Sequence, residues 1–467
     1  MFRLLKNLRT DLQPDFMRAF LKLALPIVVQ NLVSSSLYIV DNLMIGSLGE
    51  NELAAVAQAN QLSMIMNIFI FGIASGSAIY GSQFWGKKDL RGIGSVLVLA
   101  TLAAVTLGAV GSCIAFFFPR QFLSMYLHDE AVIELGVQYL RTVFPSYMIL
   151  GVTNAVAAVD KSTERVRLPM VASVLSLAIN TTLNYCLIFG NFGFPKLGLR
   201  GGAIASLTAC TTECVILTAF TFILRYPAGN FSLLRLPPVR FIRRFFKTTL
   251  PVILNEGLWG VGTTVFSMVY GAMGTQAVAA MSIAGTLDRF LYIFTVGIVH
   301  ATSILVGRTI GEGDEDGAYH CARRAITFCT GIAIVSAVVI ALVRVPVISL
   351  FSVTPETARA AATVVLIMAC ILPLRSFNYI NIVGILRSGG DTIFSMALDL
   401  GSIWTCSVPL VALTGLVLHW PIEVVVLFVY AEDIPKVLIG FRRFLSRKWI
   451  RNLVRDPEPQ KEELPCT

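Results

Sequence analysis

The chain has 467 residues, of which 55% are apolar and 14% carry a charge, whereas about 25% of the residues are charged in an ordinary soluble domain. This composition excludes a water-soluble globule, and no polar linker rich in Pro, Ser or Gly divides the chain into soluble domains. Apolar stretches recur instead, for example at 97–118 and 325–343. Each is about 20 residues long and can cross a hydrocarbon core of roughly 30 Å. We therefore predict one polytopic membrane protein.

The net charge of +9 raises the question of nucleic acid binding. The 37 Lys and Arg lie between the apolar stretches and form no stripe interleaved with exposed aromatic residues, so no nucleic acid partner is expected. Most of the nine cysteines lie inside apolar stretches, which is typical of packing and not of a disulfide framework or a metal site. The four His are scattered, and no nucleotide-binding or catalytic motif is present. We predict that the protein is not an enzyme, has no organic cofactor and draws energy from an H⁺ or Na⁺ gradient.

Twelve apolar spans can be distinguished between the polar segments of the chain. They cover 20–47, 54–83, 93–118, 137–159, 168–190, 201–224, 245–272, 278–308, 322–343, 361–386, 393–414 and 421–440. With twelve spans both termini lie on one side, where 28 of the 37 Lys and Arg fall, the loop residue Arg387 among them, against six on the other side. Because basic residues accumulate in cytoplasmic loops, we expect a multi-pass plasma-membrane protein with both termini in the cytoplasm.

An internal repeat emerges when the second half of the sequence is shifted back by 225 residues. Leu25-Pro26 then falls on Leu250-Pro251, and further matches are Gly46/Gly271, Gly49/Gly274, Gly72/Gly297, Gly86/Gly311, Asp89/Asp314 and Gly92/Gly317. After a further shift of one to three residues, Pro145 falls on Pro373 and Ser162 on Ser388. Each repeat contains six spans, an even number, so both halves enter the membrane in the same direction.

The repeat predicts an all-α membrane protein whose twelve transmembrane helices form two six-helix bundles. A pseudo-two-fold axis along the membrane normal relates the two bundles, which is the plan of a transporter. The predicted lobes cover 1–224 and 247–441. A cytoplasmic linker at 225–246 joins them, and a basic, polar cytoplasmic tail follows at 442–467.

Asp41 is an ionisable residue expected inside a span. It lies about seven residues before the Leu48-Gly49 turn, a depth of roughly 10 Å at 1.5 Å per residue. An ionisable side chain at such a depth is costly and is a functional candidate by default. Because burial disfavours the charged form of a carboxylate, Asp41 could exchange a proton or bind a small cation. The alternative is a purely structural hydrogen bond. The matching position of the second repeat holds Phe266.

Glu256 is the corresponding candidate of the second half. It lies about nine residues past Lys247, which places it near the middle of the bilayer, and its counterpart in the first repeat is Asn31. Glu256 could contact a cationic substrate or act as a coupling acid, or it could form a structural hydrogen bond with a neighbouring helix. Each lobe thus has one acid on its first helix, at different places.

Asn180 and Asn184 are spaced i, i+4 on the fifth span and share a helix face. Such a pair could hydrogen-bond a protonatable acid or complete a Na⁺ shell, although Asn pairs more often join helices. Asp288 could line a cavity or form a structural pair, since the adjacent Arg289 is about 100° away around the helix. Glu432 and Lys436, also i, i+4, are expected to form a structural ion pair near the cytoplasmic end.

Pro26 and Pro251 occupy equivalent places on the first helix of each half, where the lost backbone hydrogen bond makes a bend easy. We consider them hinge candidates that could open or close a central cavity; the alternative is that they are simply tolerated. Aromatic, Met and polar side chains could line a cavity that accepts apolar cations. The cavity candidates are Tyr38, Asn31, Met64, Tyr270, Asp288 and Asn378.

These residues resemble the multidrug and toxic compound extrusion (MATE) family over essentially the whole chain. The resemblance depends on three motifs: Asp41-Asn42-Leu43-Met44-Ile45-Gly46 with Leu48-Gly49, Leu250-Pro251 to Glu256 with Tyr270-Gly271, and Gly384-Ile385-Leu386-Arg387-Ser388-Gly389-Gly390-Asp391-Thr392. The last motif is the most specific. The resemblance implies an antiporter that exports amphipathic, often cationic compounds in exchange for H⁺ or Na⁺, by alternating between inward-open and outward-open states.

The resemblance also suggests roles for single residues. Asp41 resembles the coupling acid of the family's first helix, and Asn180, Asn184 and Ser206 resemble its partners in the first lobe. Some members have a second acid at the position of Asn184, and its absence here weakens Na⁺ binding at Asp41 and Asn180.

Glu256 resembles the seventh-helix acid of the branch that uses the second lobe. Where that branch tends to have an acid on the tenth helix, this chain has Asn378 and Asn381. Both departures favour protons over Na⁺. The sequence therefore predicts a proton-coupled multidrug exporter, expected to be a monomer in contact with small amphipathic substrates and the lipid bilayer. Two alternatives remain at this point: a lipid-precursor flippase of the same superfamily, and a membrane receptor or scaffold.

Overall fold

The computed structural model describes residues 14–126, 129–351 and 353–455, and over these residues it is helical without strands. Ten helices are long and apolar enough to cross a membrane, and Glu130–Val143 with Pro145–Ser162, bent by 48°, forms an eleventh candidate. The predicted twelfth span corresponds to α16 (Ile422–Val429) and α17 (Asp433–Leu445), separated by a 3₁₀ turn. Its charged residues explain why it does not reach the hydropathy of the others.

The first half contains α2 (Pro14–Gly46), α3 (Glu50–Lys87), α4 (Leu90–Phe117), α5 (Pro119–Ser124), α6 (Glu130–Val143), α7 (Pro145–Ser162), α8 (Arg167–Phe189) and α9 (Leu199–Ile223). The second half contains α10 (Val239–Met273), α11 (Thr275–Gly311), α12 (Glu315–Ile348), α13 (Pro355–Tyr379), α14 (Thr392–Ser402) and α15 (Val408–Ala412), followed by α16 and α17. Helix α10 begins inside the segment assigned to the linker, and α17 extends into the segment assigned to the tail.

Three short π-helical segments interrupt the second half, at Ile380–Leu386, Ile403–Ser407 and Leu413–Val417. They lie in the tenth and eleventh spans, and the described part of the first half has none. Each π turn inserts an extra residue into the helix and rotates the side chains that follow, which is a frequent device at functional sites. Two of these segments border the cavity described below.

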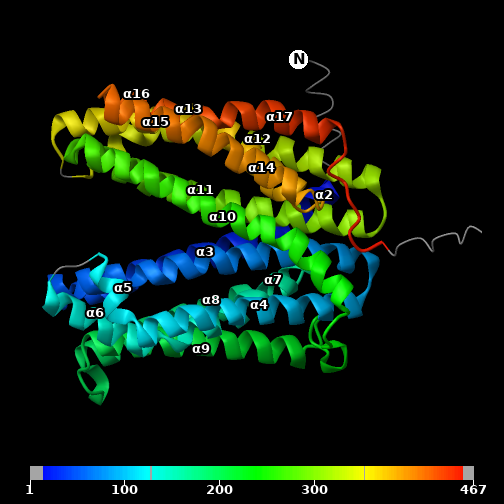
Figure 1. Ribbon diagram of the computed structural model, residues 1–467, viewed down its shortest axis with the longest axis horizontal. Coiled ribbons are helices and arrows are strands. Elements are labelled where there is room, and N and C mark those ends of the chain that lie inside the picture. Colours follow the sequence, from blue (N-terminus) through cyan, green and yellow to red (C-terminus); the bar gives the residue numbers. More distant parts are fainter. Residues whose placement is uncertain (1–13, 127–128, 352, 456–467) are drawn as a thin grey trace, which may run out of the picture.

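The two halves form two bundles that meet at one end of the molecule and diverge toward the other (Figure 1). Contacts of α3 with α10 and α11, and of α2 with α11, connect the bundles. The first turns of α2 place Phe20, Leu23 and Ile27 in a buried apolar cluster with residues of α11 and α12. The later part of α2 packs on α8 of its own half. Helix α2 therefore contacts both lobes.

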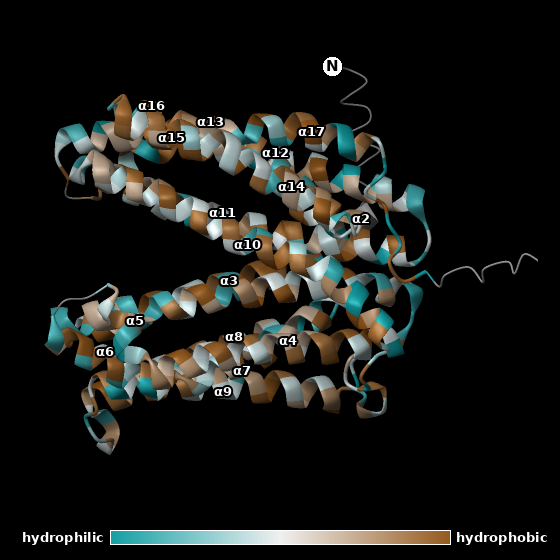
Figure 2. Cartoon of the chain, viewed as in Figure 1, coloured by the Kyte–Doolittle hydropathy of each residue, from teal (hydrophilic) through white to brown (hydrophobic). Residues whose placement is uncertain are grey.

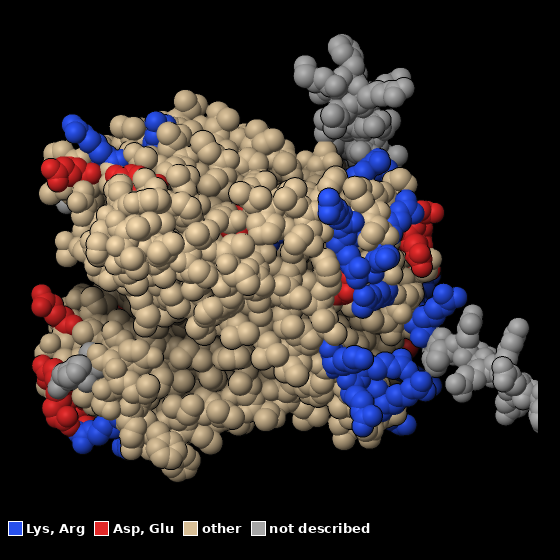
Figure 3. Space-filling model, turned by 45° about the horizontal axis from the view of Figure 1, so that its top comes forward, with Lys and Arg blue, Asp and Glu red and all other residues tan. Residues whose placement is uncertain are grey.

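Hydropathy and charge follow the expected membrane pattern. Apolar residues dominate along the helices and polar ones gather at their ends (Figure 2). Lys and Arg concentrate at the end where the bundles meet, and the molecule is hollowed between the bundles at the opposite end (Figure 3). We call these the basic end and the open end.

The structure confirms the repeat at the level of single hydrogen bonds. Asp89 Oδ1 accepts a bond of 3.0 Å from the Gly92 amide at the start of α4. Its counterpart Asp314 Oδ1 accepts a bond of 2.7 Å from the Gly317 amide at the start of α12. Each aspartate caps the amino end of its helix in the same way.

The contact between the bundles at the basic end has the same pseudo-symmetry. A side chain on Gly86 would overlap the carbonyl oxygen of Arg308, and one on Gly311 would overlap that of Gln83. These four positions are exchanged by the shift of 225 residues. Only glycine allows α3 and α11 to approach so closely, so the glycines fix how the lobes meet.

The segment after α17 crosses the basic end from one lobe to the other (Figure 1). Trp449 is fully buried in the second-lobe core, whereas Val454 belongs to a buried cluster of the first lobe. Gln83 of α3 donates to the carbonyl oxygen of Arg451 at 3.2 Å and accepts from the amide of Leu453 at 2.8 Å. This segment, predicted only as a polar tail, is therefore packed against both bundles as far as residue 455.

Candidate functional site

Asp41 lies on α2 against α8 and α9 and is held by three neutral side chains. Asn184 Nδ2 donates to Asp41 Oδ1 at 2.5 Å, and Ser206 Oγ donates to Asp41 Oδ2 at 3.3 Å. Asn184 Nδ2 also bonds to Asn180 Oδ1 at 3.1 Å, and Asn180 Nδ2 reaches Ser206 Oγ at 3.4 Å. The four residues that the sequence suggested for the first lobe are thus brought together as one closed network.

No cation neutralises this carboxylate: none of the ion pairs formed by the described residues includes Asp41. Asn180 and Asn184 are fully buried, and Asn184 Oδ1 has no hydrogen-bond partner. A carboxylate supported only by amides and a hydroxyl can take up a proton without breaking an ion pair. The same oxygen atoms are also the ligand type that hard cations prefer.

A small cavity of about 180 Å³ adjoins Asp41. Its lining is mixed apolar and polar and comes from α2, α3, α6, α7 and α9: Leu37, Asp41, Ile45, Val56, Asn60, Ser63, Tyr139, Val143, Ser146 and Ser206. The volume is sufficient for several water molecules and too small for a drug-sized compound. The cavity therefore suits exchange of a small ion.

A buried polar stripe continues from Asp41 along α8. It consists of Ser173, Ser176, Asn180 and Asn184, all less than 5% exposed and spaced three or four residues apart on one face. At its far end Ser173 Oγ donates to Glu213 Oε1 of α9 at 2.6 Å, and Gln30 Nε2 of α2 donates to Ser173 Oγ at 3.1 Å. Glu213 was not assigned a role from the sequence, although its place inside the sixth span was a signal.

The second lobe contains a larger cavity, of about 430 Å³. Its wall carries five acids and four bases, namely Glu256, Asp288, Asp399, Glu432, Asp433, Arg289, Arg375, Arg387 and Lys436, together with Trp259, Tyr292 and Tyr379. This density of charge inside a membrane protein is tolerated because most of the charges are paired.

Glu256 is bound to a buried arginine, which corrects the sequence interpretation of both residues. Arg387 Nη1 lies 2.5 Å from Glu256 Oε1, and the Arg387 side chain is 3% exposed. Arg387 was counted among the cytoplasmic loop cations, but the π-helical segment before it carries it into the lobe. Glu256 therefore has a built-in counter-ion, and its assignment as a free coupling acid loses support.

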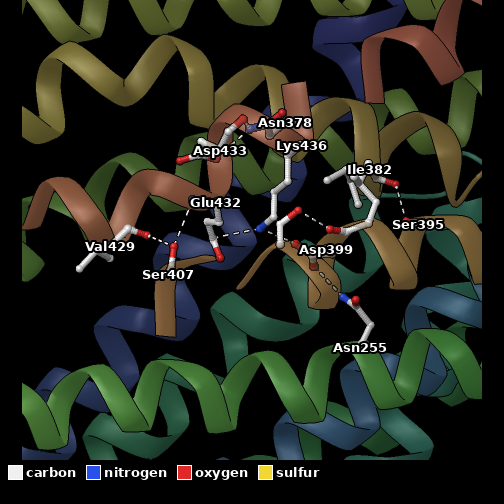
Figure 4. A network of polar contacts seen from close by, with 12 residues as sticks. Asn255, Asn378, Ile382, Ser395, Asp399, Ser407, Val429, Glu432, Asp433 and Lys436 are labelled. Carbon is white, nitrogen blue, oxygen red and sulfur yellow. Dashed lines mark hydrogen bonds and ion pairs between the residues drawn. The ribbon is translucent and has the colours of Figure 1, made fainter. Parts of the chain in front are cut away.

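Lys436 connects two acids at the centre of the lobe (Figure 4). Its Nζ lies 2.7 Å from Asp399 Oδ1 and 2.9 Å from Glu432 Oε1, and the lysine side chain is 6% exposed. The predicted ion pair between Glu432 and Lys436 is confirmed, and Asp399 is its unpredicted third member. The Lys436 ammonium thus supplies positive charge to the two carboxylates, which would otherwise need a bound cation.

Asparagine side chains complete this network. Asn255 Nδ2 donates to Asp399 Oδ2 at 2.9 Å, and Asn378 Nδ2 donates to Asp433 Oδ1 at 2.8 Å (Figure 4). Asn378, a predicted cavity residue, thus lies in the cavity wall.

Asp288 both lines the cavity and forms a pair, since Arg375 Nη1 lies 2.9 Å from Asp288 Oδ1. The two readings left open by the sequence are therefore both realised. Arg375 comes from α13, and the adjacent Arg289 is not the partner.

The other predicted residues are scattered. Tyr270 is buried in the apolar core of the second lobe and is absent from the cavity wall. Met64 is 57% exposed on α3, and Asn31 lies partly buried on α2 with its Nδ2 unbonded. The side chain of Tyr38 lies outside the described residues. Pro26 and Pro251 lie inside α2 and α10, which continue on both sides of them.

Comparisons with known proteins agree with this architecture. The chain matches the model of the MatE family over residues 26–186 and 251–413, two segments that coincide with the two repeats. It is 26% identical over 414 residues to an uncharacterized transporter, YisQ, of Bacillus subtilis, covering 88% of this chain and 90% of the relative. It is 22% identical over 474 residues to a probable multidrug resistance protein, NorM, of Thermotoga maritima, covering 99% of each chain.

Solved structures share the fold at low identity. A MOP superfamily transporter from Pyrococcus furiosus superposes with a TM-score of 0.82 at 18% identity, covering 92% of this chain and 96% of that one. A eukaryotic MATE transporter superposes with a TM-score of 0.79 at 16% identity, covering 94% and 97%. The two-lobe arrangement of twelve helical segments is therefore common to all three chains.

Proposed function

The chain belongs to the MatE family of membrane transporters, and we propose that it is a multidrug efflux antiporter that exchanges amphipathic, often cationic compounds for protons. The observation that carries the proposal is the carboxylate of Asp41, bonded to Asn184 and Ser206 and paired with no described cation. Protonation and deprotonation of such a group change the net charge of the lobe by one unit. That change can bias the lobe between two conformations.

The substrate class is supported by the relatives. Several bear the name multidrug resistance protein, among them NorM of Thermotoga maritima and PmpM of Pseudomonas aeruginosa. Apolar and aromatic side chains line part of the second-lobe cavity, among them Trp259, Phe266 and Tyr292. An apolar surface of this kind favours amphipathic molecules and sets few directional requirements, which suits a broad substrate range.

Alternating access is supported by the way the lobes meet. The contacts that close the basic end include the close approach at Gly86 and Gly311, the ion pair between Arg308 and Glu164 at 2.7 Å, and the segment after α17. A rigid-body movement that separates these contacts would open the basic end and close the open end. We propose that the basic end is cytoplasmic, because positive loops accumulate on that side, so the conformation seen is the outward-open one.

Protons are favoured over Na⁺ as the coupling ion. The first lobe has one carboxylate at its ion site, since position 184 is an asparagine, and a single carboxylate attracts Na⁺ weakly. In the second lobe Arg387 and Lys436 already compensate Glu256, Asp399 and Glu432. The first lobe therefore has one unpaired carboxylate where a tight Na⁺ site needs more negative charge, and Glu256, Asp399 and Glu432 of the second lobe already bind cations of the chain.

A lipid-precursor flippase is less well supported. Such a transporter would need several unpaired cations for an anionic headgroup in the cavity through which the substrate passes. In the second-lobe cavity Arg375, Arg387 and Lys436 are each bound to an acid. Export of amphipathic cations does not require unpaired cations in the cavity.

The test is efflux of a cationic dye from proteoliposomes under a pH gradient alone or a Na⁺ gradient alone. The proposal predicts efflux with the pH gradient that persists when Na⁺ is replaced by choline. Efflux that depends on Na⁺ and ignores the pH gradient would refute proton coupling, and no efflux under either gradient would refute antiport.

A further inference from the structure

A third cavity, separate from the two described above, lies at the basic end of the first lobe. Its volume is about 320 Å³. It is bounded by α2, the end of α3, the loop between α7 and α8, and the residues after α9, with the lining Lys22, Trp85, Thr163, Glu164, Arg165, Val166, Arg167 and Tyr226. None of these residues belongs to the Asp41 network.

The cavity carries an excess of positive charge. Lys22, Arg165 and Arg167 all line it, and none of them forms an ion pair with a described acid. Its one acid, Glu164, is held at 2.7 Å by Arg308 of the other lobe and is therefore already neutralised. The Arg165 guanidinium lies 5.2 Å from the centre of the Tyr226 ring, which positions its charge at the cavity.

The buried carboxylate nearest in the chain does not remove this excess. Asp160 interacts electrostatically with Arg165. It is fully buried, forms no ion pair in the described part of the chain, and accepts a hydrogen bond of 2.6 Å from the Thr221 hydroxyl. It is also absent from the cavity wall. The three cations thus face a space in which the described part of the chain supplies no unpaired acid.

The corresponding loop of the second lobe differs, because the chain itself supplies both the acid and the cations there. With the shift that places Ser162 on Ser388, Arg165 corresponds to Asp391. The two loops have the same backbone form, since Glu164 and its counterpart Gly390 both have positive φ, 63° and 86°.

Asp391 is bound by two arginines of the chain's own carboxyl-terminal part. Arg443 Nη2 lies 2.7 Å from its Oδ2, and Arg451 Nη2 lies 2.8 Å from its Oδ1. Trp449 and Leu453 cover the loop from outside. The second repeat therefore combines an acid with two cations at this place. Among the described residues, the first repeat has three cations here, its one acid, Glu164, is already paired, and no segment covers the loop in the same way.

Apolar surface extends from the cationic cavity along the membrane-facing helices. Leu21 and Leu25, 48% and 63% exposed, flank Lys22 on α2. On α8, Val171 and Leu175 are 45% and 43% exposed and follow Arg167 at intervals of four residues, on one helix face. Helices α2 and α8 pack together, and each carries one of these apolar pairs near its basic end. A free anion in water would not contact these apolar side chains, whereas the acyl chains of a lipid would pack against them.

We propose that this cavity is a binding site for the headgroup of an anionic phospholipid, whose phosphate contacts Lys22, Arg165 and Arg167 while its acyl chains lie along α2 and α8. The lipid supplies the negative charge that Asp391 supplies in the second lobe. Basic pockets between transmembrane helices near the membrane surface are suited to such headgroups. The proposal is independent of the coupling ion and of the transported compound.

The test measures lipid retention by the purified full-length chain with native mass spectrometry. Phosphatidylglycerol and phosphatidylcholine with identical acyl chains are compared on the wild type and on Lys22→Gln/Arg165→Gln/Arg167→Gln. The control variant, Arg235→Gln/Arg240→Gln/Arg243→Gln, removes three exposed arginines from the linker and the start of α10 at the same end of the protein. Inorganic phosphate in molar excess serves as a competitor.

We expect the wild type to retain phosphatidylglycerol preferentially. Each neutralised cation of the cavity should weaken retention by about fivefold, and the triple variant by about a hundredfold. The control variant should stay within roughly twofold of the wild type. Arg165→Lys, which keeps the charge, should retain more lipid than Arg165→Gln. If the triple variant does not fold, the comparison of these two single variants tests the proposed lipid site.

Three results would overturn the proposal. The first is equal retention of the two lipids by the wild type. The second is undiminished retention of phosphatidylglycerol by the cavity variants. The third is displacement of the lipid by inorganic phosphate at comparable concentration, which would assign the site to a free anion.

Discussion

The two lobes are built on one repeat and surround the acids of their first helices, Asp41 and Glu256, in different ways. In the first lobe Asp41 is held by amide and hydroxyl groups and is paired with no described cation. In the second lobe Arg387 binds Glu256, and Lys436 binds Asp399 and Glu432. The helical frame is thus shared, while the chemistry is not. This comparison supports the proposal that the first lobe exchanges the coupling ion, because Asp41 has no described counter-ion, whereas Glu256, Asp399 and Glu432 bind cations of the chain.

The largest expected effect comes from removing the carboxylate of Asp41, the proposed coupling acid. Asp41→Asn keeps the shape of the side chain and removes its capacity to take up a proton, so proton-driven dye efflux from proteoliposomes should fall to the background of empty vesicles. Glu134→Gln, at a residue on α6 whose side chain is 57% exposed, is the matched control and should leave efflux unchanged. If Asp41→Asn exports the dye at the wild-type rate, the coupling acid is not Asp41 and the proposed difference in function between the lobes is wrong.

The next effect concerns the permanent counter-ions of the second lobe. Lys436→Met leaves Asp399 and Glu432 buried together without a cation, which should lower the free energy of unfolding by about 3 kcal/mol. Unfolding in detergent, followed by circular dichroism, measures the change. Adding Asp399→Asn to the same variant should restore part of the loss. If Lys436→Met is as stable as the wild type, the ammonium is not the counter-ion that the structure indicates.

A smaller effect tests the symmetry of the contact at the basic end. Gly86→Val and Gly311→Val each place a side chain against a carbonyl oxygen of the other lobe. Each should destabilise the closed basic end by roughly 1–3 kcal/mol, and the two variants should slow dye efflux by similar factors. Gly331→Val, on α12 with no neighbour within 4 Å, is the control. Strongly unequal effects of Gly86→Val and Gly311→Val would contradict a pseudo-symmetric contact.

The smallest effect concerns the helix caps that the lobes share. Asp89→Ala and Asp314→Ala each remove one hydrogen bond at the start of a helix, α4 or α12. Both should lower the free energy of unfolding by about 1 kcal/mol, and neither should change the coupling ion. Thermal unfolding of the two variants side by side checks the equality. A change in ion dependence in either variant would show that coupling extends beyond the Asp41 network.

The first-lobe site could be predicted because its parts follow local rules. The depth of Asp41 in its span and the i, i+4 spacing of Asn180 and Asn184 are visible in the sequence. That these residues meet, with Ser206, is decided by the packing of α2 on α8 and α9, which the family resemblance implied.

The second-lobe network could be predicted only in part. The pair of Glu432 and Lys436 lies within one segment, whereas Asp399 reaches Lys436 from another helix. Arg387 looked like a loop cation because it follows an apolar span and precedes two glycines. A π-helical turn, which has no clear sequence signature, rotates it into the lobe.

The fourth and twelfth spans differ from the others for related reasons. The fourth is divided at Phe144, because Pro145 cannot continue the hydrogen bonding of α6. The twelfth carries the charges that complete the second-lobe network, so its hydropathy is low although it lies within the bundle. A count of apolar residues detects neither the bend before Pro145 nor the pairing of the charges in the twelfth span.

The most direct test of the account measures protons released when a cationic dye binds to the purified protein in weakly buffered detergent solution. The wild type should release protons, and the double variant Glu256→Gln/Arg387→Gln, which removes an acid together with its counter-ion, should still release them. Asp41→Asn should bind the dye without release. If Asp41→Asn releases as many protons as the wild type, or the double variant releases none, the coupling acid does not lie in the first lobe.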